Sequence, residues 1–238
     1  MQPDASRLVQ AAKLQLPLIG LYDAPDPALF APTVQPEPGM RTCLFSFYRS
    51  WVQGQFVHLS AGRYGCGGAG HWLFGLTTRS REDFVKFLVD EEGLRANSEL
   101  MEQWLDTATP FQPQYGHIFV GPLRPEAYPY LKTVSFLVNP DQLSLLIIGA
   151  HYHAAPHEPP PVLAPFGSGC SQLVAVFPDL NRAQAAIGGT DIAMRQHLPP
   201  DMLLFTVTKP MFARLCALDE RSFLFKPFWQ RLLRSRQS

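Results

Sequence analysis

The stretch Val134-Ser135-Phe136-Leu137-Val138-Asn139-Pro140-Asp141-Gln142 predicts a buried strand that passes directly into a helix. Asn139 suits the N-cap of that helix, Pro140 its first position and Gln142 its third. The segment Leu203–Pro210 repeats the pattern further along the chain. Strands alternate with helices elsewhere too, so we expect an α/β fold, with mixed α+β as the alternative, in which helices flank a mixed sheet.

These two units indicate either an internal duplication or only a common way of joining a strand to a helix. Their lengths and cysteine surroundings do not repeat, which favours the second interpretation. With 238 residues and 46% hydrophobic side chains, we expect a single domain over 1–238. It would carry a proline-rich surface loop at 24–39 and a basic C-terminal helix at about 225–236. That helix would dock through Phe228, Trp229, Leu232 and Leu233.

The charge balance argues against polyanionic partners. Twenty basic residues match twenty acidic ones, so we expect no nucleic acid and no membrane as partner. The N-terminus lacks the features of a signal peptide, and no apolar segment is long enough to span a bilayer. We therefore expect a cytoplasmic protein, in which the four cysteines are reduced thiols.

Capping and hydrophobic signals place further elements. Ser80 is predicted to cap a helix over Arg81–Asp90, and Asn97 or Ser98 is predicted to cap the next one. The apolar run Leu173–Phe177 predicts a strand.

Two segments in which a cysteine has glycine neighbours are the main candidates for a reactive or ligand-binding site. Gly62-Arg63-Tyr64-Gly65-Cys66-Gly67-Gly68-Ala69-Gly70 sets one cysteine among five glycines, and Gly167-Ser168-Gly169-Cys170 is a shorter version. Glycine permits sharp bends and close backbone approach, and a thiol there can be a ligand, a nucleophile or a redox group. The G-x-G-x-x-G pattern does not follow a strand directly, which argues against a dinucleotide site. The alternative to a functional thiol is that Cys66 is a small buried apolar side chain in a closely packed turn.

Two further sets of residues are candidates. Asp191 and Arg195 have i, i+4 spacing after Gly188-Gly189-Thr190, which predicts either a surface ion pair on a helix capped by Thr190 or a pair that orients a ligand. Three cysteines could converge on a metal or iron–sulfur cluster, although their spacings match no recognised ligand pattern. They are Cys43, Cys66 and Cys170.

Landmarks along the chain occur in a characteristic order. They are Cys43, Cys66-Gly67-Gly68, Phe74-Gly75-Leu76, Gly121-Pro122-Leu123, Asn139-Pro140-Asp141-Gln142-Leu143, Ser168-Gly169-Cys170 and the run from Gly188 to Arg195. Over roughly residues 15 to 218 this order resembles the uncharacterised archaeal cysteine-rich (ArCR) family, domain of unknown function 169. The resemblance implies a single-domain protein whose Cys43, Cys66 and Cys170 match family cysteines, and it supplies no activity.

We therefore expect a protein of unknown function that binds a small molecule or cofactor, with backbone N–H groups of the glycine loops holding an anionic or polar group. The expected ligand-binding residues are Gly65, Cys66, Gly67, Gly68, Cys170, Asp191 and Arg195. One alternative is a cysteine-dependent enzyme with Cys66 as the nucleophile and His58 or His71 as the base. The others are a metal or iron–sulfur carrier and a structural or interaction protein. The sequence names no cofactor and no oligomeric state.

Overall fold

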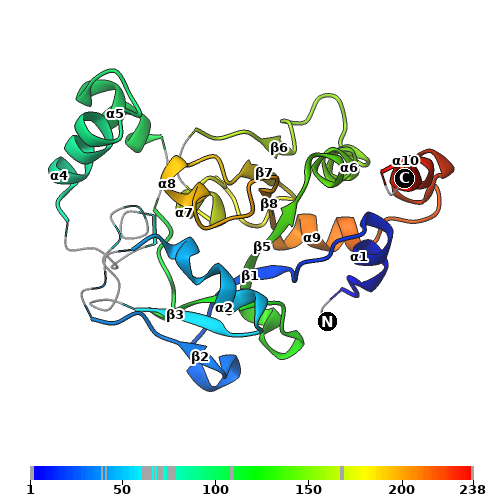
Figure 1. Cartoon of the computed structure of the whole chain (residues 1–238), viewed down its shortest axis with the longest axis horizontal. Coiled ribbons are helices and arrows are strands. Elements are labelled where there is room, and N and C mark those ends of the chain that lie inside the picture. Colours follow the sequence, from blue (N-terminus) through cyan, green and yellow to red (C-terminus); the bar gives the residue numbers. More distant parts are fainter. Residues whose placement is uncertain are drawn as a thin grey trace.

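One mixed sheet organises the chain (Figure 1). The computed structural model describes residues 3–38, 40, 42–60, 66, 68, 72–73, 79–107, 110–166 and 169–236. Within these residues the sheet has eight strands, and the predicted mixed α/β fold is confirmed. The strands are β1 (Ile19–Asp23), β2 (Thr33–Val34), β3 (Phe56–Leu59), β4 (Ile118–Pro122), β5 (Leu131–Val138), β6 (Val162–Leu163), β7 (Ala185–Gly188) and β8 (Leu203–Thr208).

The sheet consists of two halves with the same internal order, β1-β4-β3-β2 and β5-β8-β7-β6. In each half the first strand pairs antiparallel with the fourth, the fourth antiparallel with the third, and the third parallel with the second. The halves join through the antiparallel pair β1 and β5. This arrangement is an approximate two-fold repeat of topology. The two strand–helix units noted in the sequence, which begin at β5 and β8, occupy different positions within the second half.

Helices cover both faces of the sheet, and each face has its own apolar core. The face that carries the candidate site has η2 (Leu44–Phe47), α2 (Tyr48–Val52), α4 (Arg81–Lys86), η3 (Phe87–Glu91), α5 (Ser98–Asp106), α7 (Gly169–Leu173) and α8 (Ile192–Arg195). The opposite face has α1 (Ser6–Ala12), η1 (Pro27–Phe30), η4 (Pro125–Tyr130), α6 (Pro140–His151), α9 (Lys209–Cys216), η5 (Phe223–Phe225) and α10 (Pro227–Ser235).

The helix starts predicted at Ser80, Asn97 and Asn139 are confirmed by their caps. The side chains of Ser80 and Asn97 accept hydrogen bonds from the N–H groups of Asp83 and Leu100, at 3.1 and 2.9 Å. Asn139 and Gln142 form a reciprocal capping box at the start of α6. These polar residues satisfy N–H groups that have no partner inside the helix, which is why they fix its first turn.

Three local predictions are wrong. Leu173–Phe177 is not a strand, because α7 extends to Leu173 and turns follow it; a short buried apolar run does not distinguish the two structures. The segment 24–39 is more than an irregular surface loop, since it contains η1 with the fully buried Phe30 and the edge strand β2. Phe228 does not dock α10, because 62% of its surface is exposed.

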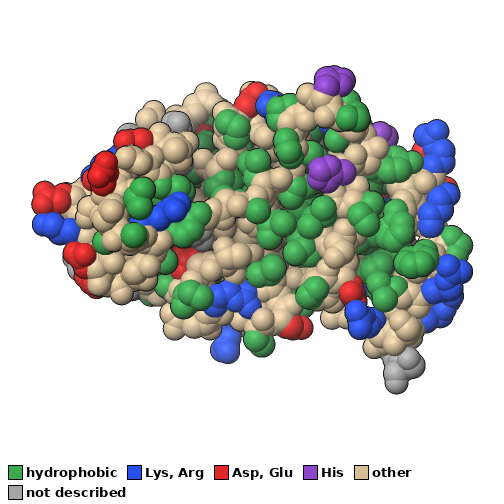
Figure 2. All heavy atoms as spheres, turned by 90° about the horizontal axis from the view of Figure 1, so that it is seen from above, with side chains coloured by type: hydrophobic (Ala, Val, Ile, Leu, Met, Phe, Trp, Pro, Cys, Tyr) green, Lys and Arg blue, Asp and Glu red, His purple; other side chains and the backbone are tan. Residues whose placement is uncertain are grey.

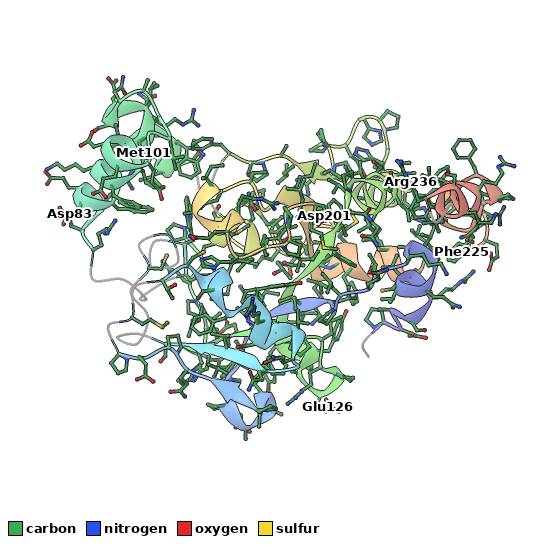
Figure 3. The ribbon with its side chains drawn as sticks, in the orientation of Figure 1. Asp83, Met101, Glu126, Asp201, Phe225 and Arg236 are labelled. Atoms are coloured by element: carbon green, nitrogen blue, oxygen red, sulfur yellow. The ribbon has the colours of Figure 1, made fainter. Side chains whose placement is uncertain are left out.

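The helices α4 and α5 form a hairpin at one end of the molecule, where Figure 3 labels Asp83 and Met101. Arg236 in the same view lies toward the opposite end, between α6 and α10. Figure 2 shows that Lys and Arg side chains gather at that opposite end. No helix within the described residues has the length and apolar character that a membrane crossing requires.

Candidate functional site

A cavity of about 230 Å³ lies on the face of the sheet covered by α2, α7 and the α4–α5 hairpin. We call it the thiol cavity. Residues from the connections of both halves of the sheet contribute to its wall. Its described lining residues are Thr42, Cys43, Phe45, Cys66, Gly68, Trp72, Arg79, Phe84, Phe87, Leu88, Glu92, Leu94, Trp104, Phe166, Gly169, Cys170, Asp191, Ala193 and Met194.

Three of the four cysteines meet in this cavity. Cys43 precedes η2, between the second and third strands of the first half, and Cys170 lies in the first turn of α7, at the same topological position of the second half. Cys66 follows β3, just as Asp191 follows β7. All four cysteines lie in the described part of the chain, and their sulfurs are thiols rather than disulfides. The approximate symmetry therefore brings residues that are distant in sequence to one cavity.

The thiols of Cys66 and Cys170 are in hydrogen-bonding contact. This contact and burial raise the pKa of Cys170 well above its ordinary value, because both favour the protonated thiol. Burial likewise raises the pKa of Cys43 to about 12, with a smaller contribution from the neighbouring Cys66, Asp191 and Glu92. Cys43 and Cys170 are therefore protonated at neutral pH, which does not suit a thiolate nucleophile.

The second half supplies a closely packed wall. A Cβ atom at Gly169 would overlap the sulfur of Met194, so any larger residue there would force the buried Met194 side chain to move. Gly189 has a positive φ of 78°, and its N–H donates to the Oε1 atom of the fully buried Gln172 at 2.8 Å. The predicted close backbone approach is thus present in the second glycine-cysteine segment.

Asp191 and Arg195 have separate roles. Asp191 lines the thiol cavity and itself caps α8 by accepting from the N–H of Met194 at 3.3 Å, so the prediction of Thr190 as the cap is wrong. Arg195 is absent from the described lining. Its guanidinium donates to four carbonyl oxygens, those of Gly189, Pro199, Pro200 and Met202, rather than to Asp191.

Among the other predicted site residues, Gly68 lines the thiol cavity. Gly65, Gly67 and His71 lie outside the described residues. His58 is wrong as a base for Cys66, because it faces the opposite side of the sheet. There its ring stacks on the ring of Phe119, with 4.5 Å between the ring centres, and its Nε2 atom lies 3.0 Å from Nδ1 of His117.

Glu92, which no sequence motif singled out, is a partly exposed carboxyl in the cavity wall. Burial, followed by the charge of Asp191, raises the pKa of Glu92 to about 7, whereas Arg79 acts in the opposite direction. A signal was present in the sequence: Asp90, Glu91 and Glu92 come at the end of a helix, where the helix dipole disfavours negative charge. The π-helix η3 that precedes Glu92 is a geometry often found at functional sites.

Aromatic side chains form much of the remaining wall, and these also escaped sequence analysis. Trp72 meets Trp104 edge to face at 5.3 Å, and Trp104 meets Phe166 in the same way at 5.1 Å. The guanidinium of Arg79 lies 4.6 Å from the ring centre of Phe87. Trp72, Phe87, Trp104 and Phe166 come from separate segments of the chain, so no local pattern could have grouped them.

A metal centre gains no support from the described residues. No three His, Cys, Asp or Glu side chains among them are grouped closely enough to hold a metal ion. Although Cys43, Cys66 and Cys170 line one cavity, they do not form such a group.

The fold and the cavity define a mixed α/β protein with a thiol-lined internal site. The chain belongs to the uncharacterised ArCR family, domain of unknown function 169, whose match covers residues 7–217. The comparison with curated proteins gave no match, and neither did the comparison with solved structures. The resemblance noted from the ordered sequence landmarks is confirmed.

Proposed function

We propose that the protein binds a small molecule in the thiol cavity, and that this molecule has an apolar, ring-containing body and a cationic or hydrogen-bond-donating end. The observation that carries this proposal is the cavity itself, formed where the two halves meet. Binding sites for small molecules are typically concave, mostly apolar and furnished with a few polar groups. Trp72, Trp104 and Phe166 offer edges and faces for a ring to pack against.

The charges of the wall favour a cation over an anion. Glu92 and Asp191 contribute two carboxyl groups, whereas Arg79 is the one Lys or Arg in the described lining. Aromatic ring faces also attract cations. An anion held by the glycine loops, as the sequence predicted, would lie near the carboxyl groups of both Asp191 and Glu92. Cys66 supplies a thiol that contacts the ligand.

Three probes of similar shape test this proposal: 2-phenylethylammonium, 2-phenylethanol and phenylacetate. Their binding is followed by tryptophan fluorescence, because Trp72 and Trp104 line the cavity. We expect the ammonium to bind about tenfold more tightly than the alcohol, a difference of about 1.4 kcal/mol, and the carboxylate to bind most weakly. Tighter binding of phenylacetate than of the ammonium would contradict the proposed ligand class.

Neighbouring residues of α8 provide matched variants. Ala193 lines the cavity, whereas Ile192 is 79% exposed and is absent from the described lining. Ala193→Phe is expected to obstruct the cavity and abolish binding of 2-phenylethylammonium, whereas Ile192→Phe should retain it. Equal binding by both variants would place the probe somewhere other than the thiol cavity.

A further inference from the structure

The contact between Cys66 and Cys170 joins the two halves of the molecule. Cys66 lies between β3 and β4, and Cys170 lies in the first turn of α7, between β6 and β7. Both side chains line the thiol cavity, and their thiols are within hydrogen-bonding contact. Two thiols in contact need only a small shift to reach the bonding distance of a disulfide, about 2 Å.

The two thiols differ in exposure. Cys66 is partly exposed, whereas Cys170 is only 4% exposed. A reagent that enters the cavity therefore reaches Cys66 first, and Cys170 is positioned behind it to complete a second step. Cys43 lines the same cavity, but the hydrogen-bonding contact of Cys170 is with Cys66. Cys216 lies on α9 and packs against the core of the opposite face.

We propose that Cys66 and Cys170 form a reversible dithiol–disulfide couple that small-molecule disulfides oxidise through the cavity. The sulfur of Cys66 attacks the incoming disulfide, which forms a mixed disulfide and releases one small thiol. Cys170 then gives its proton to the departing small thiolate as its sulfur attacks the sulfur of Cys66, so the second small molecule leaves as a thiol. The protein loses two electrons and two protons. The small-molecule disulfide takes up these electrons and protons and is thereby reduced to two thiols.

The product is a covalent bond between the halves of the sheet. It would tie Cys66 covalently to α7 and remove two thiol groups from the cavity wall. This redox couple requires access to the thiol cavity but is independent of the ligand class proposed above. The cavity therefore serves as a site of reversible covalent modification in addition to its proposed binding function.

The test treats the reduced full-length protein with glutathione disulfide, counts the remaining thiols and maps the disulfides by peptide mass spectrometry. We expect the count to fall from four to two, with one Cys66–Cys170 disulfide that dithiothreitol reverses. Cys216→Ser should still lose two thiols. Cys170→Ser should stop at a mixed disulfide between Cys66 and glutathione, because the second sulfur is missing.

Mapping of the wild-type protein decides the proposal even where Cys170→Ser fails to fold. Retention of four thiols, a stable mixed disulfide at Cys66 in the wild-type protein, or a disulfide that involves Cys43 or Cys216 would each overturn it. A protein that binds 2-phenylethylammonium but keeps four thiols would retain the proposed function and lose the redox couple. A protein that loses two thiols to a Cys66–Cys170 disulfide but does not bind 2-phenylethylammonium would retain the redox couple and lose the proposed function. The two proposals therefore fail separately.

Discussion

The two halves of the sheet share a strand order but differ in what joins their third and fourth strands. In the second half, β7 and β8 are joined through the short helix α8 and its flanking turns. In the first half, the connection between β3 and β4 contains Cys66 and the whole α4–α5 hairpin. The short connection forms a closely packed wall, and the long one supplies Glu92, Arg79 and most of the aromatic lining. The second half thus provides a closely packed wall with Cys170 and Asp191, and the first half provides most of the aromatic side chains together with Glu92 and Arg79.

The largest expected change in the free energy of unfolding tests how closely the second half is packed. Gly169→Ala would place a Cβ atom against the sulfur of Met194, and overpacking of this kind costs about 3 kcal/mol of unfolding free energy. Gly93→Ala in the first half is the matched control: its φ is +62°, but no atom lies near the added Cβ, so it should cost about 1 kcal/mol. Urea denaturation measures both. An equal cost would mean that the second half is not more tightly packed.

The next largest change in the free energy of unfolding is expected on substitution of Arg195. Arg195→Gln removes hydrogen bonds to carbonyl oxygens on both sides of α8 and should lower the free energy of unfolding by about 2 kcal/mol. Arg195→Lys should recover only part of this, because an ammonium cannot match the fork of the guanidinium. Asp191→Asn should change stability little, since asparagine is also a good N-cap. Arg195→Gln with wild-type stability but weakened probe binding would instead favour the ligand-orienting role.

Glu92 tests the chemistry of the first half. Because its pKa in the folded protein is about 7, above its ordinary value of 4.5, the folded state retains a proton that the unfolded state has lost. The wild-type protein should therefore lose stability as pH rises from 5 to 8, with Asp191, Cys66, Arg79 and Glu91 as the neighbouring groups that influence this titration.

Glu92→Gln removes this titration. Relative to the wild type it should gain about 1 kcal/mol of unfolding free energy between pH 5 and pH 8, a value reduced for solvent screening because the carboxyl is partly exposed. The exposed neighbour Glu91 provides the control variant Glu91→Gln, which should depart only slightly from the wild type, because Glu91 has the smallest of these influences on the Glu92 titration. Urea denaturation at both pH values measures the difference, and parallel curves for wild type and Glu92→Gln would contradict the assignment.

The smallest effect concerns the surface of the hairpin. Arg81 joins α4 to α5 through Glu102 at 2.5 Å and Asp106 at 2.6 Å, but all three side chains are exposed. Arg81→Ala should therefore cost only about 0.5 kcal/mol, measured by thermal denaturation at low and high salt. A cost of several kcal/mol would show that ion pairs, rather than buried side chains such as Phe84 and Met101, hold the hairpin together.

Much of the local structure could be predicted because its causes are local. Ser80, Asn97 and Asn139 cap helices by bonding N–H groups three residues away, so their spacing suffices. Leu173–Phe177 was mispredicted because an apolar run reports burial and not backbone geometry. The sequence also indicated that Cys66 and Cys216 lie in different surroundings, since Cys66 has glycine neighbours and Cys216 does not. In the structure Cys66 lines the thiol cavity, whereas Cys216 packs against the core of the opposite face.

By itself, the sequence determined the alternation of strands and helices, most of the helix starts, the family and the interest of the cysteines, because each depends on residues close together or in a fixed order. Only the tertiary structure decided that two similar halves pair through β1 and β5. That pairing brings Cys43, Cys66 and Cys170 to one cavity, adds Glu92 to it and leaves Arg195 out of its described lining. The physical reason is that strand pairing and side-chain packing act between residues distant in sequence, and no spacing along the chain records which of them will meet.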